Sequence, residues 1–204
     1  MATGGADPSD VIDFWFADAL SSAERAEARV KLWFSKNGDF DRAIEHRFGS
    51  LPESAARGEL NAWRGEAASA LALVIVLDQF PRNLFRQSPR AFDSDPLARE
   101  VALAAISREF DLALHPLHAS FLYLPLEHAE DIDLQEQSVR LFERLHARAP
   151  IELRSMFESF ASYARWHRDV IHRFGRFPHR NEVLHRPSTP AETTYLESAA
   201  ATFW

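Results

Sequence analysis

Four polar side chains stand together at the end of the most apolar stretch of the chain. The segment Glu66–Asn83 reads EAASALALVIVLDQFPRN, and its last turns carry Asp78, Gln79, Arg82 and Asn83. A carboxylate beside a guanidinium can bind an anion or assist proton transfer. If the stretch is a helix, Asp78 faces the negative end of the helix dipole, and burial of its charge adds a cost unless a cation meets it. Two interpretations stay open: an Asp78–Arg82 clasp that only fixes the turn, or a ligand site.

Two histidines interrupt apolar helical faces elsewhere and could exchange protons near neutral pH. His167 falls on the apolar stripe of a long predicted helix, and His128 shares a helical face with Phe121. An imidazole in such a place is often only a core residue with satisfied hydrogen bonds. The candidate catalytic residues are therefore Asp78, His128 and His167, and the sequence does not decide between catalysis and binding alone.

Cations gather near the C-terminal end of the chain. Between Arg165 and Arg186 there are six Arg and four of the nine His, against two acidic residues. Within this stretch of 165–186, the turn Phe177–Asn181 (FPHRN) resembles Phe80–Asn83 (FPRN), with one extra residue. Chance and ordinary turn chemistry explain this echo equally well. If the echo is not due to chance, the two turns converge on one ligand. The predicted ligand-binding residues are then Arg82, Asn83, Arg176, His179, Arg180 and Asn181.

Five acidic residues lie between Glu127 and Glu136 and need cationic partners. The helical metal-ligand spacing His-x-x-x-His does not occur in the chain, and we expect no metal and no other cofactor. The Arg-rich segment 165–186 is the expected partner, because guanidinium groups pair with carboxylates in a bidentate manner.

Composition excludes several classes of function. The chain has 204 residues, 46% of them hydrophobic, no Cys, and a net charge of −7. The acidic balance argues against nucleic-acid binding, and the absence of Cys excludes disulfides and thiolate chemistry. Gly-rich phosphate loops and the serine-hydrolase elbow do not occur. Without a signal peptide or a membrane-spanning run, we expect one cytoplasmic, all-helical domain over residues 1–204, of unknown oligomeric state.

Helix start signals predict an all-α protein. Asp7-Pro8, Asp95-Pro96 and Thr189-Pro190 each place a capping residue before proline, and Ser21 and Thr189 begin capping-box patterns. The segment Arg64–Phe80 is expected to be a buried central helix that ends at Phe80, because Pro81 follows. Short loops predict an antiparallel, solenoid-like array. The nine expected helices are Pro8–Ala19, Ser22–Phe34, Asp39–Phe48, Arg64–Phe80, Pro96–Arg108, Pro116–Ala129, Ile132–Ala147, Ile151–Phe174 and Pro190–Ala200.

Long blocks of the sequence resemble one family. These are LVIVLDQFPRNLFR (73–86), PRAFDSDPLAREVA (89–102), FLYLPLEHAEDIDLQEQSVRLFE (121–143) and HRDVIHRFGRFPHRNEVLHRPSTPAE (167–192), with VIDFWF and LWF near the start. They are similar to the domain of unknown function 924. The resemblance implies a helical fold similar to tetratricopeptide-repeat proteins and no established activity.

Two functions fit these observations. The first is a buried Arg/His/Asp cluster that binds a small anionic ligand, with or without catalysis. The second is a helical scaffold that binds a peptide or protein in a concave groove, which would expose aromatic residues from among the five Trp, at 15, 33, 63, 166 and 204.

Overall fold

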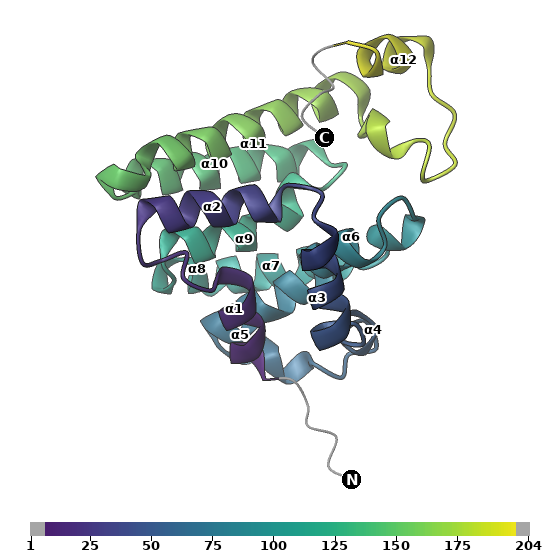
Figure 1. Ribbon diagram of the computed structural model, residues 1–204. Coiled ribbons are helices and arrows are strands. Elements are labelled where there is room, and N and C mark those ends of the chain that lie inside the picture. The colour runs from purple at the N-terminus through teal and green to yellow at the C-terminus, as the bar shows by residue number, and fades with distance from the viewer. Residues whose placement is uncertain (1–6, 199–204) are drawn as a thin grey trace.

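The fold is an array of α-helices joined by short loops, in a computed structural model that describes residues 7–198 (Figure 1). The all-α class is confirmed, since no strand occurs in that range. The α-helices are α1 (Pro8–Phe16), α2 (Ala23–Trp33), α3 (Gly38–Phe48), α4 (Leu51–Ala56), α5 (Ala67–Val74), α6 (Phe80–Leu84), α7 (Asp95–Ser107), α8 (Phe110–Ala113), α9 (Pro116–Glu127), α10 (Ile132–Arg148), α11 (Arg154–Phe174) and α12 (Pro190–Leu196). Short 3-10 turns are η1 (Asn61–Gly65), η3 (Pro89–Ala91), η4 (Ile151–Leu153) and η5 (Pro178–Arg180), and η2 (Ile75–Gln79) is a π-helical turn.

Side-chain N-caps begin six of the twelve α-helices of the described chain, namely α1, α2, α3, α9, α10 and α12. Asp7 and Thr189 each form a complete capping box with the residue three positions later. The start of α2 is one residue later than predicted, because Ser22 rather than Ser21 accepts the hydrogen bond from Arg25 N. The short helices α4 and α8 have no predicted counterpart. Part of the helix expected over residues 190–200 lies outside the described residues.

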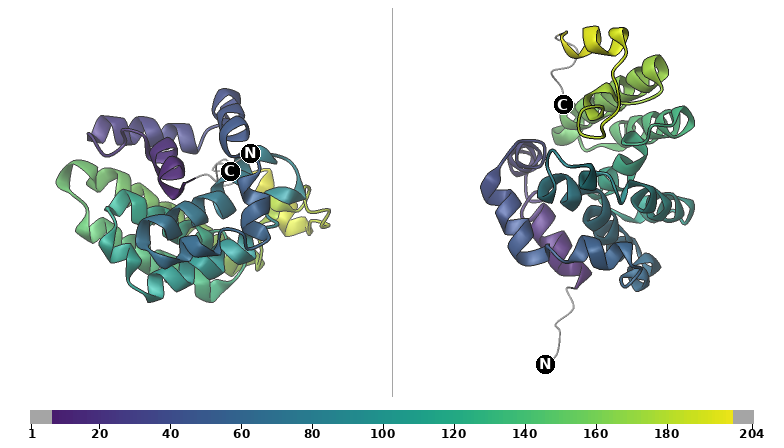
Figure 2. Two further views of the ribbon diagram at one scale, coloured as in Figure 1. Left: turned by 90° about the horizontal axis from the view of Figure 1, so that it is seen from below. Right: turned by 90° about the vertical axis from the view of Figure 1, so that its right-hand side faces the viewer.

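Successive helices pack on one another in chain order. α5 contacts α7, α7 contacts α9, α9 contacts α10, and α10 contacts α11. Figure 2 shows these helices as a stack, with α1, α2 and α3 covering one side of it. This is the expected antiparallel array around a central helix, and it fits a tetratricopeptide-like arrangement.

The apolar run forms the centre of the core, as predicted. Residues 71–77 are each no more than 2% exposed. In the same core the ring of Trp15 lies 5.8 Å from that of Phe80 and 5.7 Å from that of Phe121, centre to centre. A smaller apolar cluster joins the end of α11 to residues 175–198, called the C-terminal segment below, through Ile171, Phe177 and Tyr195. The C-terminal segment is therefore attached to the main body by its own small core.

The predicted end of the central helix at Phe80 is wrong. The backbone passes from α5 through the π-turn η2 directly into α6, so Pro81 lies in the first turn of a new α-helical stretch, where its missing N–H is tolerated. Ser94 Oγ donates a hydrogen bond of 2.6 Å to Leu77 O, the carbonyl one α-turn before Pro81. The polar end of the central segment is thereby wound into a helix instead of an open turn.

Candidate functional site

A pocket of about 960 Å³ lies where the end of the central segment meets α2, α9 and α11. Ligand sites in proteins commonly enclose about 300–1,000 Å³ with apolar walls and few polar groups. Here the walls are largely apolar, from Val30, Phe34, Ala91, Phe92, Leu124, Phe142, Met156 and Phe160. The predicted site residues Arg82, His128, His167, His179 and Arg180 all line this pocket.

Asp78 and His128 form a buried carboxylate–imidazole pair beside the pocket. His128 Nδ1 is 2.8 Å from Asp78 Oδ1, and Arg82 Nη1 is 3.2 Å from the same oxygen. Burial alone would raise the pKa of Asp78, but the charge of Arg82 and hydrogen bonds from His128 and Gln79 outweigh it and hold this pKa below its usual range. Burial, followed by the charge of Arg82, lowers the pKa of His128.

The chemistry of this pair follows from its protonation. An ionised Asp78 can only accept, so His128 donates Nδ1–H and keeps a lone pair on Nε2. His128 lines the pocket, so its imidazole is suited to take a proton from a bound molecule. Asp78 orients the ring and does not itself line the pocket.

A second carboxylate–imidazole pair, Glu127 and His167, lines the same pocket. His167 Nδ1 is 2.9 Å from Tyr163 O and 3.1 Å from Glu127 Oε1, so Nδ1 carries the proton that the carbonyl accepts. Burial, with the charge of Asp78, raises the pKa of Glu127 to about 8, and burial lowers the pKa of His167 to about 3. Both groups are therefore neutral at pH 7.

The two similar turns converge on one carboxylate. Arg82 donates to Asp95 through Nη1 and Nη2, at 2.9 and 3.0 Å, and Nη1 also donates to Asp78 O at 2.6 Å. Arg180 Nη1 lies 3.7 Å from Asp95 Oδ2, beyond hydrogen-bond distance. The guanidinium of Arg82 therefore hydrogen-bonds to Asp95 and Asp78, whereas that of Arg180 does not hydrogen-bond to Asp95.

Arg180 is buried between two aromatic rings. Its guanidinium carbon lies 4.7 Å from the ring centre of Phe92 and 4.5 Å from that of Phe177, and the residue is 6% exposed. No hydrogen bond joins the guanidinium to any residue from 7 to 198, and Nε is fully buried. Burial and the charge of Arg82 lower the pKa of Arg180 to about 10, so it stays protonated at pH 7. A buried donor left unpaired costs about 1–3 kcal/mol, more if charged.

The mouth of the pocket is also cationic. The chain has two lysines, Lys31 and Lys36, and both line it without an ion pair to a described residue. Arg86 lines it too, with Nε donating to Asp41 at 2.7 Å. Glu27 is the one anion of this lining, since Glu127 is neutral at pH 7. The charge balance favours an anion.

Three predicted ligand-binding residues lie outside this pocket. Asn83 donates to Asp41 at 2.8 Å, and Arg176 donates to Glu192 at 2.6 and 2.8 Å. Asn181 donates to Ser188 at 3.1 Å and accepts from Arg186 at 3.0 Å. These side chains hold neighbouring segments in place, because each already has its partner in the protein.

The acidic and Arg-rich segments pair only in part: Glu130 pairs with an arginine, whereas Glu127 faces His167 and Asp131 caps α10. Arg186 donates to Glu130 through Nη1 and Nη2, at 2.6 and 2.9 Å, and Phe177 N donates to the same carboxylate at 2.8 Å. These bonds anchor the turn that carries Arg180. Among the described residues, no group of three His, Asp or Glu is placed to hold a metal ion.

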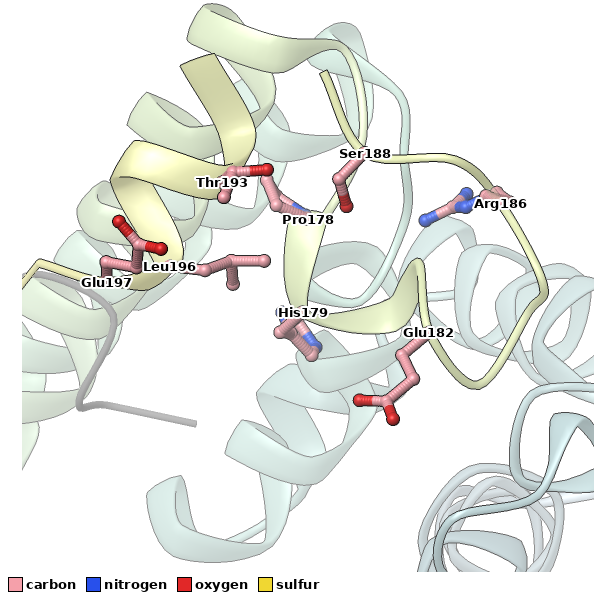
Figure 3. Close-up of a pocket in the computed structure, with 8 residues that line it drawn as sticks. All are labelled: Pro178, His179, Glu182, Arg186, Ser188, Thr193, Leu196 and Glu197. Carbon is pink, nitrogen blue, oxygen red and sulfur yellow. The ribbon is translucent and has the colours of Figure 1, made fainter. Parts of the chain in front are cut away.

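A smaller hollow of about 540 Å³ lies under the C-terminal segment. Figure 3 shows its lining, which comes from η5, the loop after it and α12. Glu182 and Glu197 oppose Arg186 there, so the hollow has no clear preference for an anion. His179 lines both cavities.

The chain is similar to known proteins both in sequence and in structure. Residues 11–200 match the family described as bacterial protein of unknown function, DUF924. The chain belongs to this family. It is also similar to a solved structure, the protein of unknown function ATU0120 from Agrobacterium tumefaciens, with 40% identity and a TM-score of 0.79 over 93% of this chain and 96% of that one. No curated protein matches. Within residues 7–198, none of the DUF924 helices has the length and apolar character that crossing a membrane requires.

Proposed function

We propose that this DUF924 protein binds a small anionic ligand in the pocket between α2, α9 and α11, with the anionic group on Arg180. The observation that carries the proposal is the buried guanidinium of Arg180, which has no hydrogen bond within residues 7–198. A bound anion would supply the acceptors that the protein does not. Lys31 and Lys36 at the mouth would attract it, and the unprotonated Nε2 of His128 would give the site a base for proton transfer.

The scaffold alternative has less support. A peptide-binding groove was expected to expose Trp side chains, but Trp15 and Trp33 are buried at 0% and 5% exposure. Trp63 and Trp166 are half-buried, and Trp204 lies outside the described residues. Two exposed aromatic residues, Phe34 and Tyr163, line the pocket itself, so they serve a small ligand there as well as a peptide.

Thermal unfolding with a panel of small carboxylates and phosphates tests the proposal. We expect at least one anion to raise the midpoint of the wild-type protein, because a ligand that binds only the folded state stabilises it. Arg180→Met should abolish the shift and Arg173→Met should keep it, since Arg173 is exposed and outside the pocket. If no anion shifts the wild type, or if the Arg180 variant responds equally, the proposal is wrong.

A further inference from the structure

The pocket extends well beyond the reach of a small anion held at Arg180. Along α11 it is lined by Met156, Phe160, Tyr163 and His167. Met156 and His167 are three helical turns apart, which corresponds to about 16 Å along the helix axis. An anion that fills only the end near His167 leaves most of this length empty.

The two ends of the pocket differ in chemistry. At the α6 end the lining includes Arg82, His128, His179 and Arg180. Toward the start of α11 the wall is made of apolar side chains from four helices, namely Val30 of α2, Leu124 of α9, Phe142 of α10 and Met156 and Phe160 of α11. Polar groups on that side are the hydroxyls of Ser120, Ser155 and Ser159, with the carboxylate of Glu27 and the ammonium of Lys31 from α2. A ligand that matches both ends has one charged head and an apolar body.

The head group is best matched by a single negative charge. Arg82 already gives two hydrogen bonds to Asp95, so Arg180 is the inner guanidinium with donors to spare. The imidazoles of His167 and His179 add no charge, because burial lowers their pKa values to about 3 and about 2. One planar guanidinium is complementary to one planar carboxylate, which it can bind through two parallel hydrogen bonds.

Taking anion binding as given, we propose that the ligand is a carboxylic acid with an unbranched apolar chain. Its carboxylate pairs with Arg180 between Phe92 and Phe177, and its chain runs along α11 toward Met156. The chain gains free energy by leaving water, and each methylene that reaches the apolar walls should tighten binding about fourfold.

Calorimetric titration of the whole protein with n-alkyl carboxylates, from acetate to decanoate, tests this proposal. We expect the affinity to rise about fourfold with each methylene and to level off once the chain fills the apolar part. Met156→Gln should weaken the long acids several-fold and leave acetate and butyrate unchanged. Glu152→Gln, on the exposed turn η4 outside the pocket, is the matched control.

The outcomes separate this inference from the proposed function. If affinity does not depend on chain length, or if phosphates bind and carboxylates do not, the amphipathic ligand is wrong but anion binding stands. If neither class of anion binds, both proposals are wrong. Should Met156→Gln fail to fold, the dependence on chain length in the wild-type protein decides alone.

Discussion

Two arginines share one carboxylate but differ in what they do for stability. Arg82 donates hydrogen bonds to Asp95 and to the backbone of Asp78, whereas Arg180 donates none to the residues described. Removing a cation from a buried ion pair strands its partner, which costs about 3–5 kcal/mol. The difference between the two guanidiniums is therefore measurable without knowledge of the ligand.

For Arg82→Met we expect the free energy of unfolding to fall by about 3–5 kcal/mol, because the buried Asp78 loses its arginine and the half-buried Asp95 loses two hydrogen bonds. Adding Asp95→Asn should recover part of this loss, since the neutral amide needs no counter-charge. Urea denaturation of both variants measures the effect. A single variant as stable as the wild type would show that Arg82 is not a structural ion-pair partner.

The pH dependence of stability should reveal Glu127. Its pKa is raised in the folded protein to about 8, so the folded state keeps a proton that the unfolded state has lost. Stability from this group is complete below its unfolded pKa of 4.5 and is lost as the pH rises toward 8. Glu127→Gln cannot titrate, so its unfolding free energy should fall less than that of the wild type between pH 5 and 8.

Urea denaturation of wild type and Glu127→Gln at these two pH values tests this expectation. Gln has nearly the same size and shape as a protonated Glu, so the variant removes the titration and keeps the packing. Parallel pH profiles for the two proteins would contradict a protonated Glu127.

At the scale of single residues the sequence predicted part of the site. Asp78 was recognisable as a charge at the end of an apolar run, and Arg180 through the echo between two turns. Asp95 was read only as a helix start, because nothing in its local pattern shows that two distant arginines reach it. Arg176 and Arg180 look equivalent in sequence, and only the position of Glu192 makes the first one structural.

At the scale of elements, the π-turn η2 is the feature that sequence rules missed. Proline normally ends a helix before itself, but here the wider turn and the hydroxyl of Ser94 compensate for the missing N–H. Such π-turns often occur at functional sites, and this one contains Asp78. The helix starts after Asp7 and Thr189 were predictable because capping is local, but Asp95 is the first residue of α7 and not its predicted cap. The continuation past Pro81 depends on Ser94 from another segment.

Ser94→Ala should therefore destabilise the protein by about 1–3 kcal/mol, because Leu77 O loses its donor in a buried place. In a Pro81→Ala background the same change should cost less, since the restored N–H at position 81 is one α-turn from Leu77 O. A double-mutant cycle from urea denaturation gives the coupling. Equal costs in both backgrounds would mean that the hydroxyl does not substitute for the missing bond.

At the scale of the whole molecule, the C-terminal segment has a separate role. It packs on α11 through a small core of its own, and it carries Arg180 into the pocket formed by the main array. The sequence predicted the array because apolar periodicity and short loops define it. It predicted a polar pocket lined by distant segments, but not the apolar extension toward Met156, since that space depends on how side chains from several helices pack.

Hydrogen exchange should show this division. We expect the amides of α12 and η5 to open at a lower free energy than those of α5, α9 and α10, because fewer apolar residues hold them. A bound anion should slow exchange around η5 more than in α7, which lies outside the pocket. Uniform protection across the molecule would contradict a separately opening C-terminal segment, and the single domain that we propose would then unfold as one unit.

The central claim is that Arg180 is buried for a ligand and not for the fold. The most direct measurement is equilibrium urea unfolding of Arg180→Met without any ligand. Because the guanidinium has no hydrogen bond to lose among residues 7–198, and methionine keeps the apolar stem, we predict an unfolding free energy equal to or above that of the wild type. A loss of about 3–5 kcal/mol, as expected for Arg82→Met, would contradict the claim and make Arg180 a structural residue.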